Sequence, residues 1–581
     1  MILQALTEHF KTLSAQGKLA QPGWSEAKIS YALYLNDNGE LKQAAPLKVE
    51  QTRGKKTVLV PRTFSLPSPA KRTVGIVPNF LWDNSAYILG VDNKGKPARS
   101  AECFSSCRAL HHQLLDGVDS PAARVLLAFF DRWKPEKAAE HPALKNDWEE
   151  ITSNANLIFR YNGAFVHEDP LIRQAWQDSY DAAEDGPEMV CLVTGRRGTV
   201  EATHPAVKGV TGAQSSGAAL VSFNAPAFCS YGHEQNLNAP VSKYAAFAYT
   251  SALNYLLADR DHVYRIGDTT VLFWAQNGRT VYQNLFGAFA MGANTTYSTS
   301  DLSGTAKKLF EGESVSWEDE KLDPNMNFYI LGLAPNAARL SVRFFLHNTF
   351  RGFLRNIQAH YDRLEIVRPS FDKFETLPLW KLLGETVNQN SRDKSPAPNM
   401  AGAALRAVLT DTPYPATLLN GVTLRIRAER EVTRGRAAIL KAYYLKHPHP
   451  DFDSKEVCTV SLNPDSTSVP YNLGRLFSVL EEIQSAANPG INTTIKDKYF
   501  NAASATPSRV FPTLINLAQK HLRKIDTGKT VYYNKKLSEP LEKLGESFPD
   551  RMNLPEQGAF QLGYYHQTQN RYQKKEEKEH V

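Results

Sequence analysis

The stretch Ile29-Ser-Tyr-Ala-Leu-Tyr-Leu35, followed by Asn36-Asp-Asn-Gly39, decides the fold class of the N-terminal region. Large apolar side chains alternate with smaller or more polar ones along the first segment, which is typical of a strand with one buried face. The Asn-Gly ending of the second segment is typical of a tight turn, and another strand pattern follows it. The sequence therefore predicts an antiparallel β-hairpin.

Outward from this hairpin, helix and strand patterns are mixed as far as about Tyr361. Ser120-Pro121 is typical of a helix start, because proline fits the first helical position. We expect helices over 101–116, 120–134, 169–182, Tyr244–Leu257 and about Ala337–Tyr361. We expect strands near Thr57–Val60, Tyr87–Val91, Thr269–Trp274 and Asn327–Leu333, and short strands with glycine-rich turns between Glu188 and Asn224.

The character of the chain changes after Asn388–Met400, a segment rich in Asn, Ser, Pro and Lys that is typical of a linker or an exposed loop. Beyond it, apolar residues recur with the helical period, as at Leu473, Leu476, Phe477, Leu480 and Ile483. We expect helices over Ala403–Leu409, Gly421–Tyr444, Leu473–Gln484, Ser508–Lys524, Ser538–Leu544 and Gln557–Lys578.

These patterns together predict an α+β fold. It consists of a mixed α/β N-terminal region with antiparallel sheets, followed by a helical-bundle C-terminal domain. We place the two domains at 1–386 and 401–581, with a linker at 387–400 between them.

The composition is that of a folded protein with a modest basic excess. The 581 residues carry a formal net charge of +7, 42% of them are hydrophobic and 22% are charged, so the chain is not broadly disordered. This length indicates about two to four domains. The excess of cations fits a protein that contacts phosphate over part of its surface, although many proteins that bind no nucleic acid are equally basic.

The five cysteines are odd in number and widely spaced, which argues against a disulfide framework. Cys103, Cys107, His111 and His112 form a C-x3-C-x3-H-H string that could suggest zinc. Because no second ligand pair lies at a useful spacing, we favour two buried thiols on one helix face, with no metal and no cofactor. We find no signal-peptide pattern and no apolar run near ~20 residues, so we expect a cytoplasmic protein without a membrane span.

The segment between Glu50 and Asp83 contains no acidic residue. Its cations are Arg53, Lys55, Lys56, Arg62, Lys71 and Arg72. Four prolines, Pro61, Pro67, Pro69 and Pro78, are expected to keep it extended and loop-like. A cationic loop of this kind suits a phosphate backbone, because each neutralised phosphate releases counterions, but a solvated surface loop is an equally good interpretation.

Cations also recur every four residues in the predicted helix after Pro335, at Arg339, Arg343, His347, Arg351 and Arg355. On a helix this row winds slowly round one side, while Phe344, Phe345, Leu346, Phe350, Phe353 and Leu354 supply the buried side. A solvated helix would normally mix acids with its arginines. We therefore favour nucleic acid, or an acidic neighbour, as the partner of this row.

The segment Thr211-Gly-Ala-Gln-Ser-Ser-Gly217 resembles a phosphate-binding loop at first sight, but it lacks a Gly-Lys-Ser/Thr ending and is expected to precede a strand, Ala218–Phe223. A nucleoside triphosphate site is therefore not expected. Gln214, and the amides Asn224, Gln235 and Asn236 that follow, could instead read base edges. Ordinary turn chemistry is the alternative.

Arg425, Arg427, Arg430, Arg434 and Arg436 are partly offset by Glu429 and Glu431. This group is compatible with a strand-binding surface or with a salt-bridged helix face. No sequence pattern of a hydrolase nucleophile, a zinc protease, a zinc deaminase or a two-metal nuclease is present, and Asp259, Asp261 and His262 lack a further metal partner. We therefore do not expect an enzyme; a DNA-processing nuclease of an antiviral system is the alternative.

Several strings, taken in order, resemble the large subunit of the type I-C CRISPR interference complex. They are 71-KRTVGIVPNFLWDNSAYILG-90, 204-HPAVKGV-210 with 215-SSGAALVSFN-224, Tyr231-Gly with Asn238-Ala-Pro240, 331-LGLAPNAAR-339 and 557-QGAFQLGYYHQ-567. Each string alone is weakly specific, whereas their order along nearly the whole chain is strongly so.

The resemblance implies a bacterial, non-catalytic subunit that reads a short flanking motif (the protospacer-adjacent motif) on duplex DNA and helps to open the duplex while a guide RNA reads the sequence. The implied partners are the guide crRNA, target DNA and its displaced strand, backbone, crRNA-end-binding and small subunits, and a helicase–nuclease recruited after R-loop formation. The helical C-terminal part would contact the displaced strand. It is often also made as a separate small subunit, for which Met400 or a non-Met codon could be the start.

Neutral amides on loops, flanked by cations, are the residue types expected to read a flanking motif. The predicted motif-reading residues, with the adjacent backbone contacts, are Lys71, Arg72, Asn79, Asn84, Gln214, Ser215, Ser216, Asn224 and Asn236. The predicted backbone-binding residues are Arg53, Lys55, Lys56, Arg339, Arg343, Arg351, Arg355, Arg425 and Arg427. Phe80 or Trp82 could wedge the duplex open, but a place in the core is favoured for both. A purely structural scaffold in the same complex is a further alternative.

Overall fold

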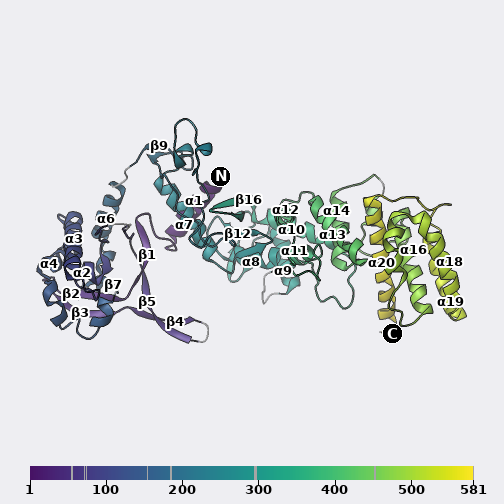
Figure 1. Cartoon of the computed structure of the whole chain (residues 1–581), viewed down its shortest axis with the longest axis horizontal. Coiled ribbons are helices and arrows are strands. Elements are labelled where there is room, and N and C mark those ends of the chain that lie inside the picture. The colour runs from purple at the N-terminus through teal and green to yellow at the C-terminus, as the bar shows by residue number, and fades with distance from the viewer. Residues whose placement is uncertain are drawn as a thin grey trace. The chain divides into compact units, whose positions relative to one another are not determined.

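The computed structural model describes residues 1–53, 56–70, 72, 75–153, 155–182, 186–292, 298–450 and 453–579. The chain forms two compact units, each described below by itself. The first unit contains residues 1–205 and 221–252, and the second contains 206–220 and 253–581 (Figure 1). Residues 206–220 therefore belong to the second unit although the chain on both sides of them belongs to the first.

The main sheet of the first unit confirms the predicted hairpin. β2 (Tyr31–Leu35) pairs with β3 (Leu41–Pro46) in antiparallel register, and β7 (Asn156–Tyr161) joins β2 in parallel. β6 (Trp82–Asn84) and the short β8 (Ala164–Phe165) both pair with β7. The parallel pair makes the sheet mixed, which the alternating sequence pattern did not indicate.

Two helices supply much of the core of this unit, and both were predicted. They are α3 (Pro97–Leu115) and α4 (Pro121–Arg132), the latter capped by the Ser120 hydroxyl as expected. Phe129 and Phe130 of α4 pack on Phe159 of β7, with ring centroids 5.3 and 5.8 Å apart. The remaining helices are α1 (Ile2–Ala15), α2 (Ser85–Ile88), α5 (Trp148–Thr152), α6 (Pro170–Ala182) and the first part of α7 (Lys243–Ala258).

Two predictions for this unit were wrong. The strand expected near Tyr87–Val91 is instead the short helix α2, which begins at Ser85 because the Asn84 side chain accepts a hydrogen bond from the Ala86 amide. The acid-free segment is not mainly a loop, because most of its first half forms β5 (Lys56–Pro67), which includes the strand expected near Thr57–Val60.

β5 tolerates Pro61 because its partner changes there. Residues 56–61 pair with β4 (Lys48–Arg53) and residues 62–67 pair with β1 (Trp24–Ile29). The missing N–H of Pro61 therefore falls where one ladder ends and the other begins, which is compatible with a long strand. In the rest of this unit, β9 (Glu188–Val190) and β10 (Arg197–Thr199) form a two-stranded pair.

The second unit is built on an antiparallel sheet in the order β11-β12-β15-β16. β12 (Thr269–Ala275) is buried along its whole length between β11 (Val263–Ile266) and β15 (Asn327–Asn336), which fits its β-branched and aromatic residues. Phe273 of β12 contacts Phe286 of α8 (Val281–Met291) at 4.6 Å between ring centroids. A smaller pair, β13 (Val315–Trp317) and β14 (Glu320–Leu322), and helix α9 (Thr299–Phe310) complete this region.

The long helix predicted over Ala337–Tyr361 was wrong over its first half. Residues Arg339–Thr349 form β16, and only Phe350–Leu364 form a helix, α10. A two-residue turn at Ala337 and Ala338 returns the chain against β15, and the ring of Phe344 packs over Gly332 of that strand. The cross-strand contacts of β16 thus override its helical spacing.

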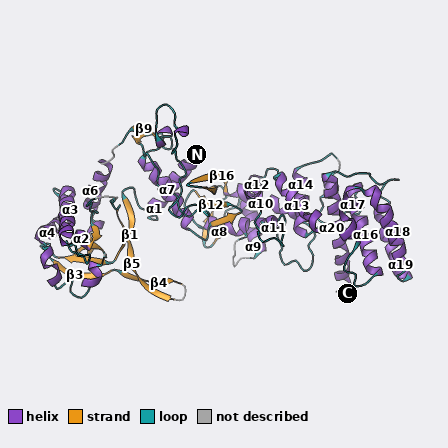
Figure 2. Cartoon of the chain, in the orientation of Figure 1, coloured by secondary structure: helices purple, strands orange, loops and turns teal. Residues whose placement is uncertain are grey.

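Beyond Thr349 the described chain contains helices and no strand (Figure 2). In order these are α10, α11 (Leu379–Gly384), α12 (Pro398–Thr410), α13 (Ala416–Glu429), α14 (Arg434–Lys446), α15 (Ser454–Val457), α16 (Val469–Ala487), α17 (Ile495–Ala505), α18 (Pro507–Leu522), α19 (Thr527–Leu541) and α20 (Leu554–Glu579). The single helix expected over Gly421–Tyr444 was wrong, because Arg430 adopts a left-handed backbone (φ 56°) that ends α13.

Helices α16 and α20 lie unusually close together because glycine faces the partner backbone on each side. A Cβ at Gly474 would overlap the carbonyl oxygen of Phe560, and a Cβ at Gly563 would overlap that of Tyr471. Arg475, fully buried beside this contact, bonds Asn472 and Gln567 at 2.9 and 3.2 Å. The tight seam explains why the sequence near 557–567 is rich in glycine and aromatic residues.

The predicted α+β class is confirmed, with antiparallel sheets in the N-terminal part and helices in the C-terminal part. The compact units divide elsewhere than the predicted boundary at 387–400, where α12 begins at Pro398, so that functional division stays a prediction. Among the described residues, every helix is too short or too polar to cross a bilayer.

Candidate nucleic-acid interface

The loop 206–220 is fastened to one end of the sheet of the second unit. Ala219 forms a parallel bridge with Arg339, through bonds of 3.0 Å from the Ala219 amide to the Ala338 carbonyl and from the Leu340 amide to the Ala219 carbonyl. The Thr211 amide donates to the hydroxyl of Thr270 on β12 at 3.1 Å. The strand expected over Ala218–Phe223 is therefore wrong: only isolated bridges at Ala218 and Ala219 form.

This anchored loop presents neutral polar side chains to solvent. Gln214, Ser215 and Ser216 are exposed in a turn closed by the Gly217 amide on the Gln214 carbonyl at 3.0 Å. Gly217 has φ 106°, and a Cβ there would clash with the Ala206 side chain, so the turn requires glycine. An amide and two hydroxyls on a fixed backbone can donate and accept hydrogen bonds without attracting phosphate by charge.

Cations gather at the same end of the sheet. Arg339 begins β16 beside Ala219, and Arg343 forms an ion pair with Asp268 of the β11–β12 turn at 2.5 Å. Arg406 is exposed on α12 and has no ion-pair partner among the described residues. Polar hydrogen-bonding groups and cations thus lie at the same end of one sheet, a combination that duplex recognition needs.

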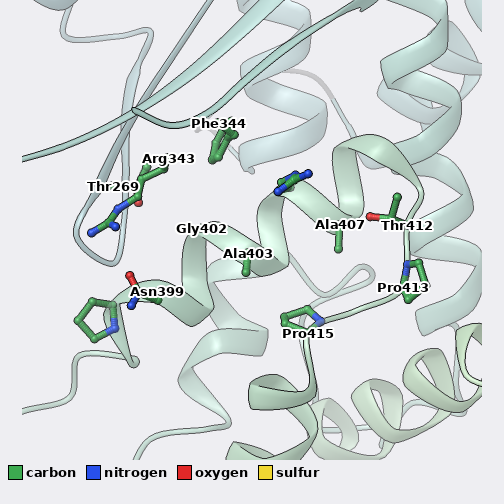
Figure 3. A pocket seen from close by; sticks show the side chains of 12 residues that line it. Thr269, Arg343, Phe344, Asn399, Gly402, Ala403, Ala407, Thr412, Pro413 and Pro415 are labelled. Atoms are coloured by element: carbon green, nitrogen blue, oxygen red, sulfur yellow. The ribbon is translucent and has the colours of Figure 1, made fainter. Parts of the chain in front are cut away.

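A cavity of 290 Å³ lies between β16 and α12. Figure 3 shows Arg343 on one wall and Asn399, at the start of α12, on the other. Arg406, Thr269 and Thr412 also line the cavity. Guanidinium, amide and hydroxyl groups facing one hollow suit the oxygen atoms of a phosphate backbone.

The row of cations at four-residue spacing is split by the end of β16. Arg339, Arg343 and His347 lie on the strand, whereas Arg351 and Arg355 lie on α10. Arg351 and Arg355 are exposed, share one side of the helix and have no ion pair among the described residues. The single continuous cationic stripe that the sequence predicted is therefore wrong.

In the first unit, the predicted motif-reading residues around 70–84 hold the chain together. Arg72 contacts Asp83, donates to the Val77 carbonyl at 2.6 Å and lies over the Tyr87 ring at 4.2 Å. The side chain of the buried Asn79 accepts a hydrogen bond from the Ala70 backbone amide at 3.0 Å. The backbone amide of Asn79 donates to the Asp83 carboxylate at 2.9 Å. Burial raises the pKa of Asp83, although Arg72 and two backbone amides oppose the shift.

This arrangement argues against base reading by Asn79 and Asn84, because both side chains already bond the backbone. Lys55 and Lys71 lie outside the described residues, and Arg53 and Lys56 are placed only as strand residues. Phe80 and Trp82 are buried, and Phe80 stacks on Trp176 at 5.5 Å between ring centroids, so the favoured core interpretation is confirmed.

The two remaining predicted amides differ in accessibility. Asn224 is exposed. Asn236 is buried, and its backbone amide donates to the Ala202 carbonyl at 3.2 Å. Both belong to the first unit, while Gln214, Ser215 and Ser216 belong to the second. The sequence grouped these residues because they are close along the chain.

The C-terminal arginines are mostly engaged within the protein. Arg425 pairs with Glu429 at 3.4 Å, and Arg427 donates to Gln557 at 2.8 Å. Arg436 is buried against Glu429 and Glu385. These contacts support the salt-bridged interpretation, and Arg427 and Arg430 are the exposed members of the group.

The family model for CRISPR-associated protein (Cas_Csd1) matches residues 6–572. The chain belongs to this family. The resemblance of the sequence strings is thereby confirmed, and this Csd1-family chain is a CRISPR-associated protein. No curated protein matches the chain.

Two of the strings that carry the Csd1 resemblance meet at the sheet end described above. The second string contributes residues 206–210 and 215–220 of the loop, and 331–339 contributes the β15–β16 turn, next to which Ala219 bridges Arg339. The string 557–567 has another role, since it forms the side of α20 that packs on α16. These strings therefore lie both in a seam of the core and on a polar surface.

Sequence reasoning missed Arg406 and Asn399 of this surface. Arg406 is a single cation in an alanine-rich helix, and Asn399 falls in the segment predicted as a linker. The only available signal was that Arg406 is the one charged residue between Pro398 and Thr410. Their place beside Arg343 depends on tertiary packing.

The candidate metal residues of this Csd1-family chain are engaged in other contacts. Cys103 and Cys107 are buried on α3, and His111 accepts from the Leu81 amide at 3.0 Å. His262 bonds Asp259 and Asn284, each at 2.6 Å. Within the described ranges, no group of three or more His, Cys, Asp and Glu side chains is arranged to hold a metal ion.

Proposed function

We propose that this chain is the non-catalytic large subunit of a type I-C CRISPR surveillance complex, and that the sheet end of its second unit contacts target DNA next to the guide-paired region. The observation that carries the proposal is the bridge between the loop 206–220 and β16, which places exposed Gln214, Ser215 and Ser216 at the same sheet end as Arg339 and Arg343. Family membership supports a place in the CRISPR machinery.

The neutral and the cationic residues of this sheet end have different roles in the proposal. Gln214 can form two hydrogen bonds to a base edge, and the hydroxyls of Ser215 and Ser216 can donate or accept. Arg339, Arg343 and Arg406 would bind backbone phosphates and set the register without reading sequence. Because Asn79, Asn84 and Asn236 are engaged or buried, we assign motif reading to the loop instead.

The wider role follows from the family and is part of the same proposal. The chain would bind guide RNA and the other subunits, stabilise the opened duplex, and recruit a separate helicase–nuclease. Arg351 and Arg355, exposed on α10, are candidates for further contacts with the nucleic-acid backbone.

The test is binding of the assembled complex to a library of duplexes with randomised flanking motifs. We expect the double variant Gln214→Ala/Ser215→Ala to lose preference between motifs by about tenfold, since one good pair of base contacts discriminates by roughly 1–3 kcal/mol. Arg406→Ala should weaken binding to all DNA sequences alike, and it should reduce the slope of log affinity against log salt concentration by about 1.

Two exposed residues on α18 and at its end provide matched controls. Gln519→Ala and Arg523→Ala remove the same side-chain types from the second unit and should leave binding unchanged. Unaltered motif preference in the loop variant would reject the loop as the reader and favour a scaffold role. Metal-dependent DNA cleavage by the purified chain would instead support the nuclease alternative.

A further inference from the structure

A second, larger cavity lies within the first unit, between α1, the β9–β10 turn and the start of α7. Its volume is 640 Å³, within the range of pockets that hold small organic ligands. None of the sequence motifs discussed above falls in it.

The β9–β10 turn is held in place by its own backbone and by α7. The Cys191 amide bonds the Arg196 carbonyl at 2.9 Å, and the Gly195 amide bonds the Cys191 carbonyl at 2.8 Å. The Ser242 amide, just before α7, donates to the Cys191 thiol at 3.3 Å, and Val200 bridges Ser242. Arg196 and Arg197 are therefore presented to the cavity by a fixed turn.

The charge of the lining is positive. Lys11 of α1, Arg196 and Arg197 are its cations, and Glu8 is its one acid. Glu8 pairs with Lys11 at 2.8 Å, and Arg197 lies 3.6 Å from Glu188, a longer contact. Arg196 has no ion pair among the described residues. Two guanidinium groups thus remain available to a ligand with several anionic oxygens, which Arg binds in forked geometry.

The turn that carries these cations also holds a buried thiol among hydrogen-bond donors. Burial alone would raise the pKa of the Cys191 thiol, but hydrogen bonds from Ser242 and Thr194 outweigh it and lower the pKa to about 7. Thr194 and Ser242 both line the cavity.

Beyond the cations, the cavity has further volume and an aromatic wall. Tyr244 of α7 lines the cavity and packs edge-on against Phe10 of α1, with centroids 6.3 Å apart. An aromatic side chain held in this way offers a surface against which a base can stack. Phosphate alone would leave most of a 640 Å³ cavity empty.

We propose that this cavity binds a phosphoryl group together with the nucleoside that carries it, with Arg196 and Arg197 as the phosphate ligands. The same chemistry can come from the phosphorylated end of an RNA strand or from a free nucleotide. The proposal is independent of motif reading by the loop of the second unit.

The experiment is calorimetric titration of the full chain at constant ionic strength, with sodium chloride as the reference salt. The probes are inorganic phosphate, AMP and an RNA hexamer with and without a 5′-phosphate. We expect AMP to bind at least tenfold more tightly than inorganic phosphate. The double variant Arg196→Gln/Arg197→Gln should weaken AMP binding by at least tenfold.

The matched control is Arg99→Gln/Arg124→Gln, which removes two exposed arginines from α3 and α4 of the same unit and should leave affinity unchanged. Tighter binding of the 5′-phosphorylated hexamer than of AMP, lost with the phosphate, would identify a strand end; equal or weaker binding would identify a free nucleotide. No binding of any probe at millimolar concentration, or full binding by the Arg196/Arg197 variant, would overturn the proposal. A thermal shift with AMP that the variant loses provides a second measurement.

Discussion

The loop 211–217 and the arginine-rich helices α13 and α14 are opposites in the way they use polar residues. The loop has no charged side chain, yet Gln214, Ser215 and Ser216 all face solvent. The helices carry a dense set of arginines, yet Arg434 and Arg436 are buried and Arg425 and Arg427 bond neighbouring side chains. The region that looks more like a nucleic-acid binder in the sequence is the one that holds the core together.

The difference teaches that a count of arginines does not define a binding surface. A buried guanidinium must be paired, and its partners come from distant parts of the chain, such as Glu385 for Arg436. A loop needs only a rigid base to be useful, and here the sheet edge supplies it. The following experiments test this division, in order of decreasing expected effect.

Replacing Arg436 by alanine should have the largest effect. Arg436 lies between Glu429 and Glu385 and also bonds the Glu431 carbonyl at 2.9 Å. Its loss would leave the partly buried Glu385 without its ion-pair partner, and breaking a buried pair costs about 3–5 kcal/mol. Urea denaturation measures this loss, and Arg523→Ala on the surface should change stability by less than about 0.5 kcal/mol.

Closing the glycine seam should have the next largest effect. Gly563→Ala would place a methyl group against the Tyr471 carbonyl, so α16 and α20 would have to move apart. Overpacking of this kind costs about 1–3 kcal/mol, and we expect the upper end because backbone faces backbone. Gly545→Ala, where a Cβ meets no other atom within 4 Å, is the control. Equal stability of the two variants would contradict the close seam.

Acid should weaken the second unit while leaving the chemistry of its loop unchanged. Burial lowers the pKa of His360 and of His566 to about 3, against about 6.5 in the unfolded chain. The unfolded state therefore binds more protons below pH 6.5, so this part of the stability is complete above pH 6.5 and is lost as the pH falls toward 3.

At pH 5.5 the two histidines together should cost about 2–3 kcal/mol of unfolding free energy. Denaturation at pH 7.5 and 5.5 measures the loss, and His566→Gln should make it smaller. Because residues 211–217 include no titratable side chain, motif preference of the folded complex should not follow this pH window. If motif preference and stability changed together with pH, motif reading could not be assigned to a loop without titratable side chains.

The smallest effect on stability is expected from Arg406→Ala. Arg406 is exposed and has no ion-pair partner among the described residues, so the free energy of unfolding should change by less than about 0.5 kcal/mol. Binding of the complex to DNA should fall three- to tenfold, corresponding to about 1 kcal/mol. The pair Arg406→Ala and Arg436→Ala would thus separate surface function from interior structure. Loss of stability without loss of binding in the Arg406 variant would reverse that assignment.

The fold was predictable where the sequence pattern fitted only a strand or only a helix. It was ambiguous where the pattern fitted both. The hairpin at 29–46 follows from two strand patterns on either side of an Asn-Gly turn. The spacing of Arg339, Arg343 and His347 is compatible with both structures, because four residues is two periods of a strand and about one turn of a helix. Pro335-Asn336 and the aromatic run after it were the signals for β16.

Residue roles were less predictable than elements. Asn84 is as good a helix cap as a base reader, and only the position of the Ala86 amide decides between them. Gln214, Ser215 and Ser216 were correctly expected on a loop, because glycine on both sides excludes a regular element. Their sheet-edge anchor, and the place of Arg406 beside the cavity that Arg343 also lines, require contacts between residues far apart in sequence.

The crossing of the chain at 206–220 has a consequence for dissecting this protein. A fragment that starts at 253 would not contain the whole second unit, because it lacks the segment that bridges Ala219 to Arg339 and bonds Thr270. It would expose the first residues of β16 as an unprotected edge, a common cause of self-association. A synthetic peptide of residues 206–220, added in trans, would restore the bridge at Arg339 and the bond to Thr270.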